Sequence, residues 1–280
     1  MSLSVDVCIA CYKKDPLLRE ALDSIRMQTY QNGSVQVYFD DEGIGTGEAF
    51  NKAISLSKAD IVVLLCSDDV FTDKNVISDI VAQFENPEIA HVSRWYHQFV
   101  ENDRTPVRAW RGNNVIELAN NPSGLAFRRA IMPRLTNKMF VEVSEPVWRI
   151  TTCKLSGIPY GYSILRYDTV AVRIHQSISR TPGYYKKMWN SSPVEEWAKL
   201  GWEVNDFTHL IQVGVNFEKK AVAQEACQFL NYNKWAFINP AFWFFFVVAL
   251  WTPREILYKI PEIYRSTWGR WTTREVKRGK

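Results

Sequence analysis

The sequence predicts an α/β fold, a mixed, mostly parallel sheet with helices on both faces. Three observations predict it. Short apolar runs without polar alternation occur at 5–12 and 61–66, as in strands that are covered on both faces. Segments with apolar residues at helical spacing lie between such runs. Acidic pairs stand at the ends of two strands, at 40–41 and 68–69. Strands that alternate with helices in this way indicate a doubly wound parallel sheet.

Each element of the repeat has its own signal. After the strand at 5–12, Asp15-Pro16 suits the first turn of a helix. The apolar residues of that helix share a face and are Leu18, Ala21, Leu22 and Ile25. The strand at 35–41 leads through a loop with three glycines into a second helix. The apolar residues of the second helix are Ala49, Phe50, Ala53 and Ile54. The third strand then runs into Ser67-Asp68-Asp69.

Three strand ends should therefore point at one crevice. They carry Tyr12, the pair Asp40-Asp41 and the pair Asp68-Asp69. In open α/β sheets the ligand lies outside the carboxyl ends of the strands. Adjacent acids are costly unless a cation neutralises them, and a divalent metal that carries substrate phosphates does so. The alternative, a solvated Asp-Asp turn that caps the next helix, stays open on these residues alone.

Six motifs follow one another in a familiar order. They are ACYKK at 10–14, FDDEG at 39–43, FNKAI at 50–54, LLCSDDV at 64–70, SGLAFRR at 123–129 and RIHQSIS at 173–179. In these motifs the chain resembles the family 2 glycosyltransferases of the GT-A fold. Members of that family transfer a sugar from a nucleotide diphosphate with inversion. The resemblance implies the same fold, a UDP-sugar or related donor, and Mn²⁺ or Mg²⁺.

The resemblance also implies roles for single residues. The residues expected to bind the donor are Tyr12 beside the nucleobase, Asp40, Asp41, Asn51, Ser67 and Asp69. The expected metal ligands are Asp68 and His175. Cys66 departs from the family pattern, because an acid or an asparagine usually stands there, and Asp68 must carry the coordination.

The catalytic base is expected at Glu145. The family has a Glu-Asp pair at the start of a helix, and here Pro146 replaces the Asp. The base is therefore Glu145 or, as the second choice, Glu142. Pro146 suits the first turn of a helix, so Glu145 should lie near the positive end of the helix dipole, which favours its ionised form.

The expected function is inverting transfer of a hexosyl or pentosyl group to an acceptor hydroxyl, in cell-surface or lipid-linked glycan synthesis. Two alternatives stay open. One is a glycosyltransferase that modifies nucleic acid, for example hydroxylated bases of DNA. The other is an inactive binding or scaffold protein with the same fold.

The chain, 280 residues long, should divide into a catalytic domain at 1–215 and a helical, aromatic-rich region at 216–280. Residues 252–280 hold eight Lys or Arg against three Glu, a net +5, whereas the whole chain carries +4. The apolar run at 241–251 is too short to span a bilayer. Three uses of this region stay open: contact with an anionic membrane surface, binding of nucleic acid, and packing against the catalytic domain.

The expected location is cytoplasmic, at the inner face of a membrane if the C-terminal region binds lipid. Five cysteines, an odd number without paired spacing, suit a reducing compartment. The N-terminus MSLSVD has neither the basic start nor the apolar core of a signal peptide.

Overall fold

The computed structural model describes residues 2–13, 15–100, 103–118, 121–132, 161–174, 210, 211, 214, 219–232, 237–257, 275 and 276. The chain forms two units. The first comprises Met1–Thr181 with Thr272–Lys280, and the second comprises Pro182–Trp271. The expected domain boundary at residue 215 lies outside the described residues and stays a prediction.

The first unit is built around one sheet. Its described strands are β1 (Val5–Tyr12), β2 (Gly33–Asp40), β3 (Ile61–Cys66), β4 (Val70–Phe71), β5 (Ile89–Val100), β6 (Asp103–Trp110), β7 (Ala126–Arg128) and β8 (Gly161–Ile174). Its described helices are α1 (Leu18–Arg26), α2 (Thr46–Leu56), α3 (Val76–Phe84), the short α4 (Val115–Leu118) and the 3-10 turn η1 (Arg129–Ile131).

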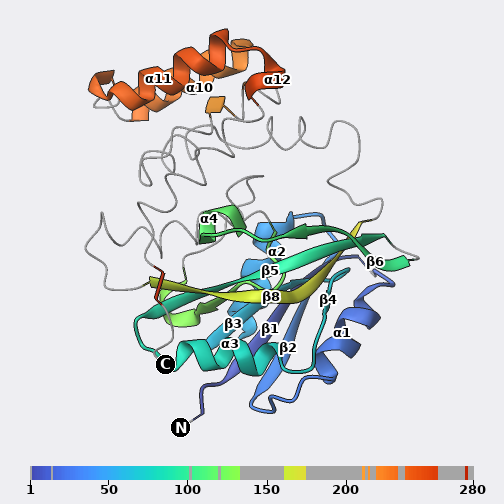
Figure 1. Ribbon diagram of the computed structural model, residues 1–280. Helices are drawn as coiled ribbons and strands as arrows, with labels where there is room; N and C mark the ends of the chain where they lie inside the picture. Colours follow the sequence, from blue (N-terminus) through green and yellow to red (C-terminus); the bar gives the residue numbers. More distant parts are fainter. Residues whose placement is uncertain are drawn as a thin grey trace. The chain divides into compact units, whose positions relative to one another are not determined.

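The sheet is mixed, and most of its strands run in one direction (Figure 1). Its order is β2-β1-β3-β7-β5-β8-β4, and β6 pairs with β5 outside this path. β1 is parallel to both β2 and β3, and β5 is parallel to β8. β7 joins these two parallel groups by antiparallel pairing on each side. The expected α/β architecture is confirmed.

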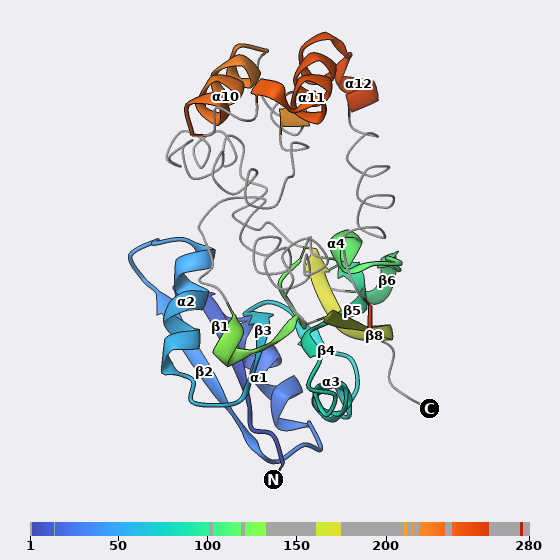
Figure 2. The ribbon, with the colours of Figure 1, turned by 90° about the vertical axis from the view of Figure 1, so that its left-hand side faces the viewer.

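Helices cover both faces of the sheet (Figure 2). Alternate residues of a strand point to opposite faces. In β1 the residues Val5, Val7, Ile9 and Cys11 share a buried cluster with apolar residues of α1 and α3. α2 contacts β1 and β2, and its buried Phe50 lies outside that cluster. α2 therefore covers the face opposite to α1 and α3.

The end of the chain returns to the sheet of the first unit. The backbone N–H of Val276 donates to the carbonyl of Tyr162 at 2.8 Å. Arg166 Nη2 donates to Glu275 Oε1 at 2.7 Å, and Val276 packs into the main core cluster. Residues 275 and 276 lie within 216–280, the region expected to be helical, and so short a stretch has no recognisable strand pattern.

The second unit is helical in its described part. Its helices are α10 (Lys219–Tyr232), α11 (Pro240–Trp251) and α12 (Arg254–Leu257). Buried residues of this unit form a separate cluster: Leu210, Ile211, Val222, Ala226, Phe242, Phe245, Ala249 and Leu257. Within the described segments, no helix combines the length and the apolar character that crossing a bilayer requires.

Candidate functional site

Strand register brings the expected site residues to one edge of the sheet. β1 is parallel to both of its neighbours, and Tyr12 at its end is paired with Asp40 of β2. On the other side Ala10 is paired with Cys66, the last residue of β3. Residues 67–69 continue from that end. Tyr12, Asp40 and the turn after β3 therefore lie at the same sheet edge, as the sequence pattern predicted.

Asp40 holds the glycine loop that follows β2. Its side chain is buried, and its two carboxylate oxygens accept hydrogen bonds from the backbone N–H groups of Ile44 (2.8 Å) and Gly45 (3.1 Å). Gly43 and Gly45 have φ angles of +74° and +98°, which residues other than glycine rarely adopt. Asp40 thus fixes the loop's backbone, while the neighbouring Asp41 is exposed.

Tyr12 offers an accessible aromatic ring beside this loop. Its side chain is 43% exposed, and Lys13 Nζ lies 5.0 Å from the ring centroid. A Cβ atom placed on Gly43 would lie 3.9 Å from Tyr12 Cε2, so the loop approaches the ring closely. Lys13 has a φ of 56°, a conformation of the kind found at ligand sites. The arrangement suits stacking of a planar base on Tyr12.

The turn after β3 is tied to the start of α1. Ser67 Oγ donates to Asp15 Oδ2 at 2.8 Å, and Asp15 Oδ1 accepts from the backbone N–H of Leu17 at 2.9 Å. The turn is closed by a bond from the N–H of Asp69 to the carbonyl of Cys66 at 3.3 Å. Ser67, expected at the donor, is buried and is held by Asp15.

Asp69 is buried and links three segments of the chain through hydrogen bonds. Its side chain is 2% exposed. Ser123 Oγ lies 2.5 Å from Asp69 Oδ2, and the backbone N–H of Arg173 donates to Asp69 Oδ1 at 2.9 Å. Ser123 Oγ also accepts from the N–H of Cys66 at 2.9 Å. Burial, reinforced by the neighbouring Asp68, raises the pKa of Asp69 to about 8.

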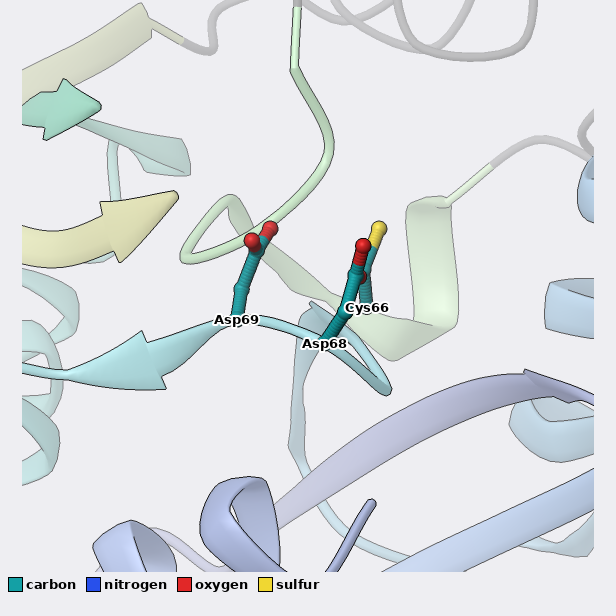
Figure 3. Close-up of side chains that lie close together, drawn as sticks. All are labelled: Cys66, Asp68 and Asp69. Atoms are coloured by element: carbon teal, nitrogen blue, oxygen red, sulfur yellow. The ribbon is translucent and has the colours of Figure 1, made fainter. Parts of the chain in front are cut away.

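Cys66, Asp68 and Asp69 form a group with metal-binding capacity (Figure 3). One ligand atom of each lies within 4.8 Å of the others. Figure 3 shows the side chains of Cys66 and Asp68 next to each other. Asp69 is buried and both of its oxygens accept hydrogen bonds. Asp68 is only half-buried, so its carboxylate is the more accessible of the two to a metal.

The donor set fits a divalent cation that carries phosphates. Mg²⁺ is commonly bound through one or two carboxylates together with phosphate oxygens and water. Asp68 supplies such a carboxylate, and Cys66 adds a soft sulfur donor in the same group. Thiolates favour Zn²⁺ among the common divalent metals, whereas carboxylates suit Mg²⁺ and Mn²⁺.

Two buried arginines complete the site, and the sequence analysis missed both. Arg94 in β5 is fully buried and donates to the carbonyls of Ser123 (2.6 Å), Leu118 (3.1 Å) and Asn121 (2.9 Å). Burial lowers the pKa of Arg94 to about 10, so it stays cationic at neutral pH. A charged residue inside an apolar strand, as in HVSRWY, was the signal that could have found it.

The other buried arginine is Arg173 in β8. Its Nε donates to the carbonyl of Asp68 at 3.1 Å, and its Nη2 donates to Glu20 Oε2 at 2.7 Å. Arg173 therefore connects β8 to the turn that carries Asp68 and to α1.

The remaining expected site residues have other positions. Asn51 lies in α2, where its Nδ2 donates to Glu48 Oε2 at 3.2 Å. Glu142, Glu145 and His175 lie outside the described residues, and their expected roles stay predictions.

Part of the chain matches the model of a known protein family. Residues 28–140 match the model of glycosyl transferase family 2. This stretch runs from before β2 to beyond β7 and includes the whole Cys66–Asp69 turn and Ser123. The predicted resemblance to the family 2 glycosyltransferases is confirmed. A comparison of the sequence with curated proteins found no match.

One solved structure shares the fold. TarS 1-349 from S. aureus, in complex with UDP-GlcNAc, is 12% identical, with a TM-score of 0.50; the alignment covers 95% of this chain and 88% of TarS 1-349. Two others are less similar in structure. The mannosyltransferase PcManGT from Pyrobaculum calidifontis, with GDP-Man and Mn²⁺, is 17% identical, with a TM-score of 0.46 over 97% of this chain and 84% of that one.

The other is glucosyl-3-phosphoglycerate synthase from Mycobacterium tuberculosis, with Mn²⁺ and UDP-glucose. It is 15% identical, with a TM-score of 0.48 over 72% of this chain and 79% of that one. At 12% identity the likeness to TarS 1-349 shows the fold alone, which is the GT-A fold that the sequence motifs predicted.

The pKa of Asp69 predicts a pH dependence of stability. The folded chain keeps the Asp69 proton up to about pH 8, whereas the unfolded chain loses it near pH 4. Stability should therefore fall as the pH rises between these values, by up to about 1.4 kcal/mol per pH unit from this group. In Asp69→Asn the neutral amide removes this dependence. We expect the melting temperature of the native chain, measured in EDTA, to decline relative to Asp69→Asn from pH 5 to pH 8.

Asp60→Asn is the control for that experiment. Hydrogen bonds from Ser4 lower the pKa of Asp60, so Asp60 is ionised throughout this window in both states. Its difference from the native chain should stay flat. A flat difference for Asp69→Asn as well would show that Asp69 is ionised in the folded chain.

Proposed function

We propose that this chain is an inverting glycosyltransferase that moves a hexosyl or pentosyl group from a nucleotide diphosphate to an acceptor hydroxyl. The observation that carries the proposal is the meeting of Tyr12, the Asp40 loop and the Asp68 turn at one sheet edge. A base-stacking ring and a phosphate-carrying metal are both needed by such a donor. The family match over residues 28–140 supports it, because that match includes the Asp68 turn.

The donor is a UDP-sugar in this proposal. The base stacks on Tyr12, whose ring is accessible, and the ribose and base edges meet the loop that Asp40 holds, with Asp41 exposed on it. Asn51 lies in the helix that begins after the same loop. TarS, which shares the fold, is known in complex with UDP-GlcNAc, and this supports the choice of a uridine nucleotide.

Asp68 holds a divalent cation, Mn²⁺ or Mg²⁺, and His175 is the proposed second ligand. Cys66 lies within reach of the same ion. When bound, such a cation neutralises the charge that develops on the diphosphate leaving group. Arg173 keeps the Asp68 backbone in place through its 3.1 Å bond to the Asp68 carbonyl. Asp69 supports the metal site indirectly, by holding the turn that carries Asp68. Its own oxygens are engaged by Ser123 and Arg173.

Glu145 accepts the proton of the acceptor hydroxyl as that oxygen attacks the anomeric carbon, and Glu142 is the second candidate. The sequence context supports Glu145, because Pro146 suits a helix start and the helix dipole there favours a carboxylate. A base must lie within about 3 Å of the hydroxyl that it deprotonates.

The acceptor is a cell-surface or lipid-linked glycan, and the proposed location is the cytoplasmic face of a membrane. The basic, aromatic-rich composition of 241–280 supports an acceptor at a lipid surface. No observation favours a nucleic-acid acceptor or an inactive scaffold over this function.

Donor binding can be tested by thermal shift. We expect UDP with Mn²⁺ to raise the melting temperature more than UDP alone, and more than dTDP, GDP or CDP with Mn²⁺. Ligand at 100 times its Kd stabilises a protein by about 2.7 kcal/mol. Asp68→Ala should abolish the part of the shift that depends on Mn²⁺, because it removes the carboxylate ligand.

The matched control is Asp23→Ala, which removes an exposed carboxylate from α1 and should leave the shift intact. A shift that survives in Asp68→Ala, or no shift with any of the nucleotides, would mean that the donor site has been assigned wrongly.

The base can be tested by Glu145→Gln. This change keeps the size of the side chain and removes its basicity, so donor affinity should persist while turnover falls by about 10²–10⁴-fold, the usual contribution of general base catalysis. Glu142→Gln, measured in parallel, should keep most of its activity. Near-normal turnover in Glu145→Gln with loss in Glu142→Gln would transfer the role to Glu142.

A further inference from the structure

α11 has an exposed apolar face that its own unit leaves uncovered. The helix contains no charged residue, and its sequence PAFWFFFVVALW is apolar throughout. Phe242, Phe245 and Ala249 are buried in the cluster of the second unit. On the opposite side Phe244, Val247 and Trp251 are 60%, 49% and 82% exposed. Spacings of three and four residues place these three on one helix face.

The exposed face continues beyond the start of the helix. Phe237 and Ile238, just before it, are 62% and 69% exposed. Phe237 is held against the helix, because Trp243 Nε1 donates to its carbonyl at 2.6 Å and the two rings make an edge contact with centroids 5.5 Å apart. We call Phe237, Ile238, Phe244, Val247 and Trp251 the apolar strip.

The helix that carries the strip is firmly built at both ends. Asn239 Oδ1 accepts from the N–H of Ala241 at 2.9 Å, and Pro240 occupies the first turn. At the other end Lys219 Nζ donates to the carbonyls of Ala249 (2.7 Å) and Thr252 (3.1 Å). These bonds satisfy terminal backbone groups, so the strip is presented on a preformed helix.

We propose that the apolar strip docks α11 into the interface of a membrane with anionic lipid. A helix that is apolar all round is stable in water only where its whole surface is covered. Twelve residues make a helix of about 18 Å, well short of the roughly 30 Å of a bilayer core. α11 therefore lies in the plane of the interface, with Phe and Trp side chains at the level where aromatic residues gather.

The charge of the following sequence selects anionic lipid. Between Lys234 and Arg254 the chain has no charged residue. The rest of the second unit's sequence, residues 252–271, then holds four Lys or Arg (Arg254, Lys259, Arg265 and Arg270) against Glu255 and Glu262, a net +2. An uncharged apolar segment followed by a basic one matches the two layers of a lipid surface, acyl chains beneath anionic headgroups.

The purpose of the docking, to bring the enzyme to a lipid-linked acceptor, rests on the proposed function. Lipid binding itself needs neither donor nor acceptor. The two proposals therefore fail separately, because vesicle binding and the UDP·Mn²⁺ thermal shift are measured on the same preparations.

The test is flotation of the full chain with vesicles of phosphatidylcholine containing phosphatidylserine. The native chain should float with the vesicles, and less of it with phosphatidylcholine alone. Phe244→Asp/Trp251→Asp should lower the bound fraction by roughly tenfold or more, because two aromatic side chains leave the lipid. Phe244→Ser/Trp251→Ser, which adds no charge, should also lower it.

The matched control is Leu56→Asp/Val107→Asp in the first unit. These side chains are 55% and 57% exposed, so the control adds the same two charges to exposed apolar positions elsewhere. It should float like the native chain. All variants should keep the native circular dichroism spectrum and a cooperative melting transition, which shows independently of donor binding that they are folded.

Three results would overturn the docking proposal. The native chain could fail to float, which would mean that a protein surface covers the strip. The control could lose flotation as much as the strip variant, which would mean that net charge alone drives binding. Finally, the chain could retard DNA in gel shift without binding vesicles, and lose that retardation in the strip variant; the strip would then be a nucleic-acid surface.

Discussion

The buried carboxylate of Asp69 is the constraint on which the candidate site depends. A carboxyl group without solvent must be hydrogen-bonded, since an unsatisfied one would destabilise the fold by several kcal/mol. Asp69 meets this need with Ser123 and with the backbone of Arg173. It thereby ties the end of β3 to the loop before β7 and to β8. The position of Asp68, one residue earlier, follows from these bonds.

Two buried arginines make the same framework rigid. Arg94 donates hydrogen bonds to backbone carbonyls of the 118–123 segment. Gly124 allows the chain to pass close to Arg94, since a Cβ atom on Gly124 would lie 3.1 Å from Arg94 Nε and 2.6 Å from Val170. Arg173 reaches Glu20 and the Asp68 carbonyl. Buried charges of this kind are costly when one partner is removed, so substitutions here should disturb the whole edge of the sheet.

The first half of the sheet could be predicted from the sequence because its signals are local. The apolar run at 5–12 became β1 with the same bounds, and the acids at its edge lie where parallel strands must end together. The later half could not be predicted in this way. β5, β7 and β8 are paired across long sequence separations. The periodicity of apolar residues within one segment does not indicate which distant strand that segment pairs with.

The same physics explains which site residues were predictable. Asp40 is the last residue of β2, and Asp68 lies two residues after the end of β3, so their placement needed only the strand pattern. The bracing role of Asp69 depends on Ser123, 54 residues away, and on Arg173, 104 residues away. The family motif at 123–129 marked Ser123 as part of a shared segment, but its partner is a matter of tertiary structure. The proposal that Glu145 is the base rests on the motif alone.

In the proposed site Asp68 binds the metal while Asp69 holds the turn. A crystal structure of the chain with UDP and Mn²⁺, with anomalous diffraction data for manganese, tests this most directly. We expect one manganese peak within about 2.5 Å of an Asp68 oxygen, the range of metal–carboxylate bonds, with Asp69 still bonded to Ser123 and Arg173. A peak bound by Asp69 in place of Asp68, with the Ser123 bond broken, would contradict it.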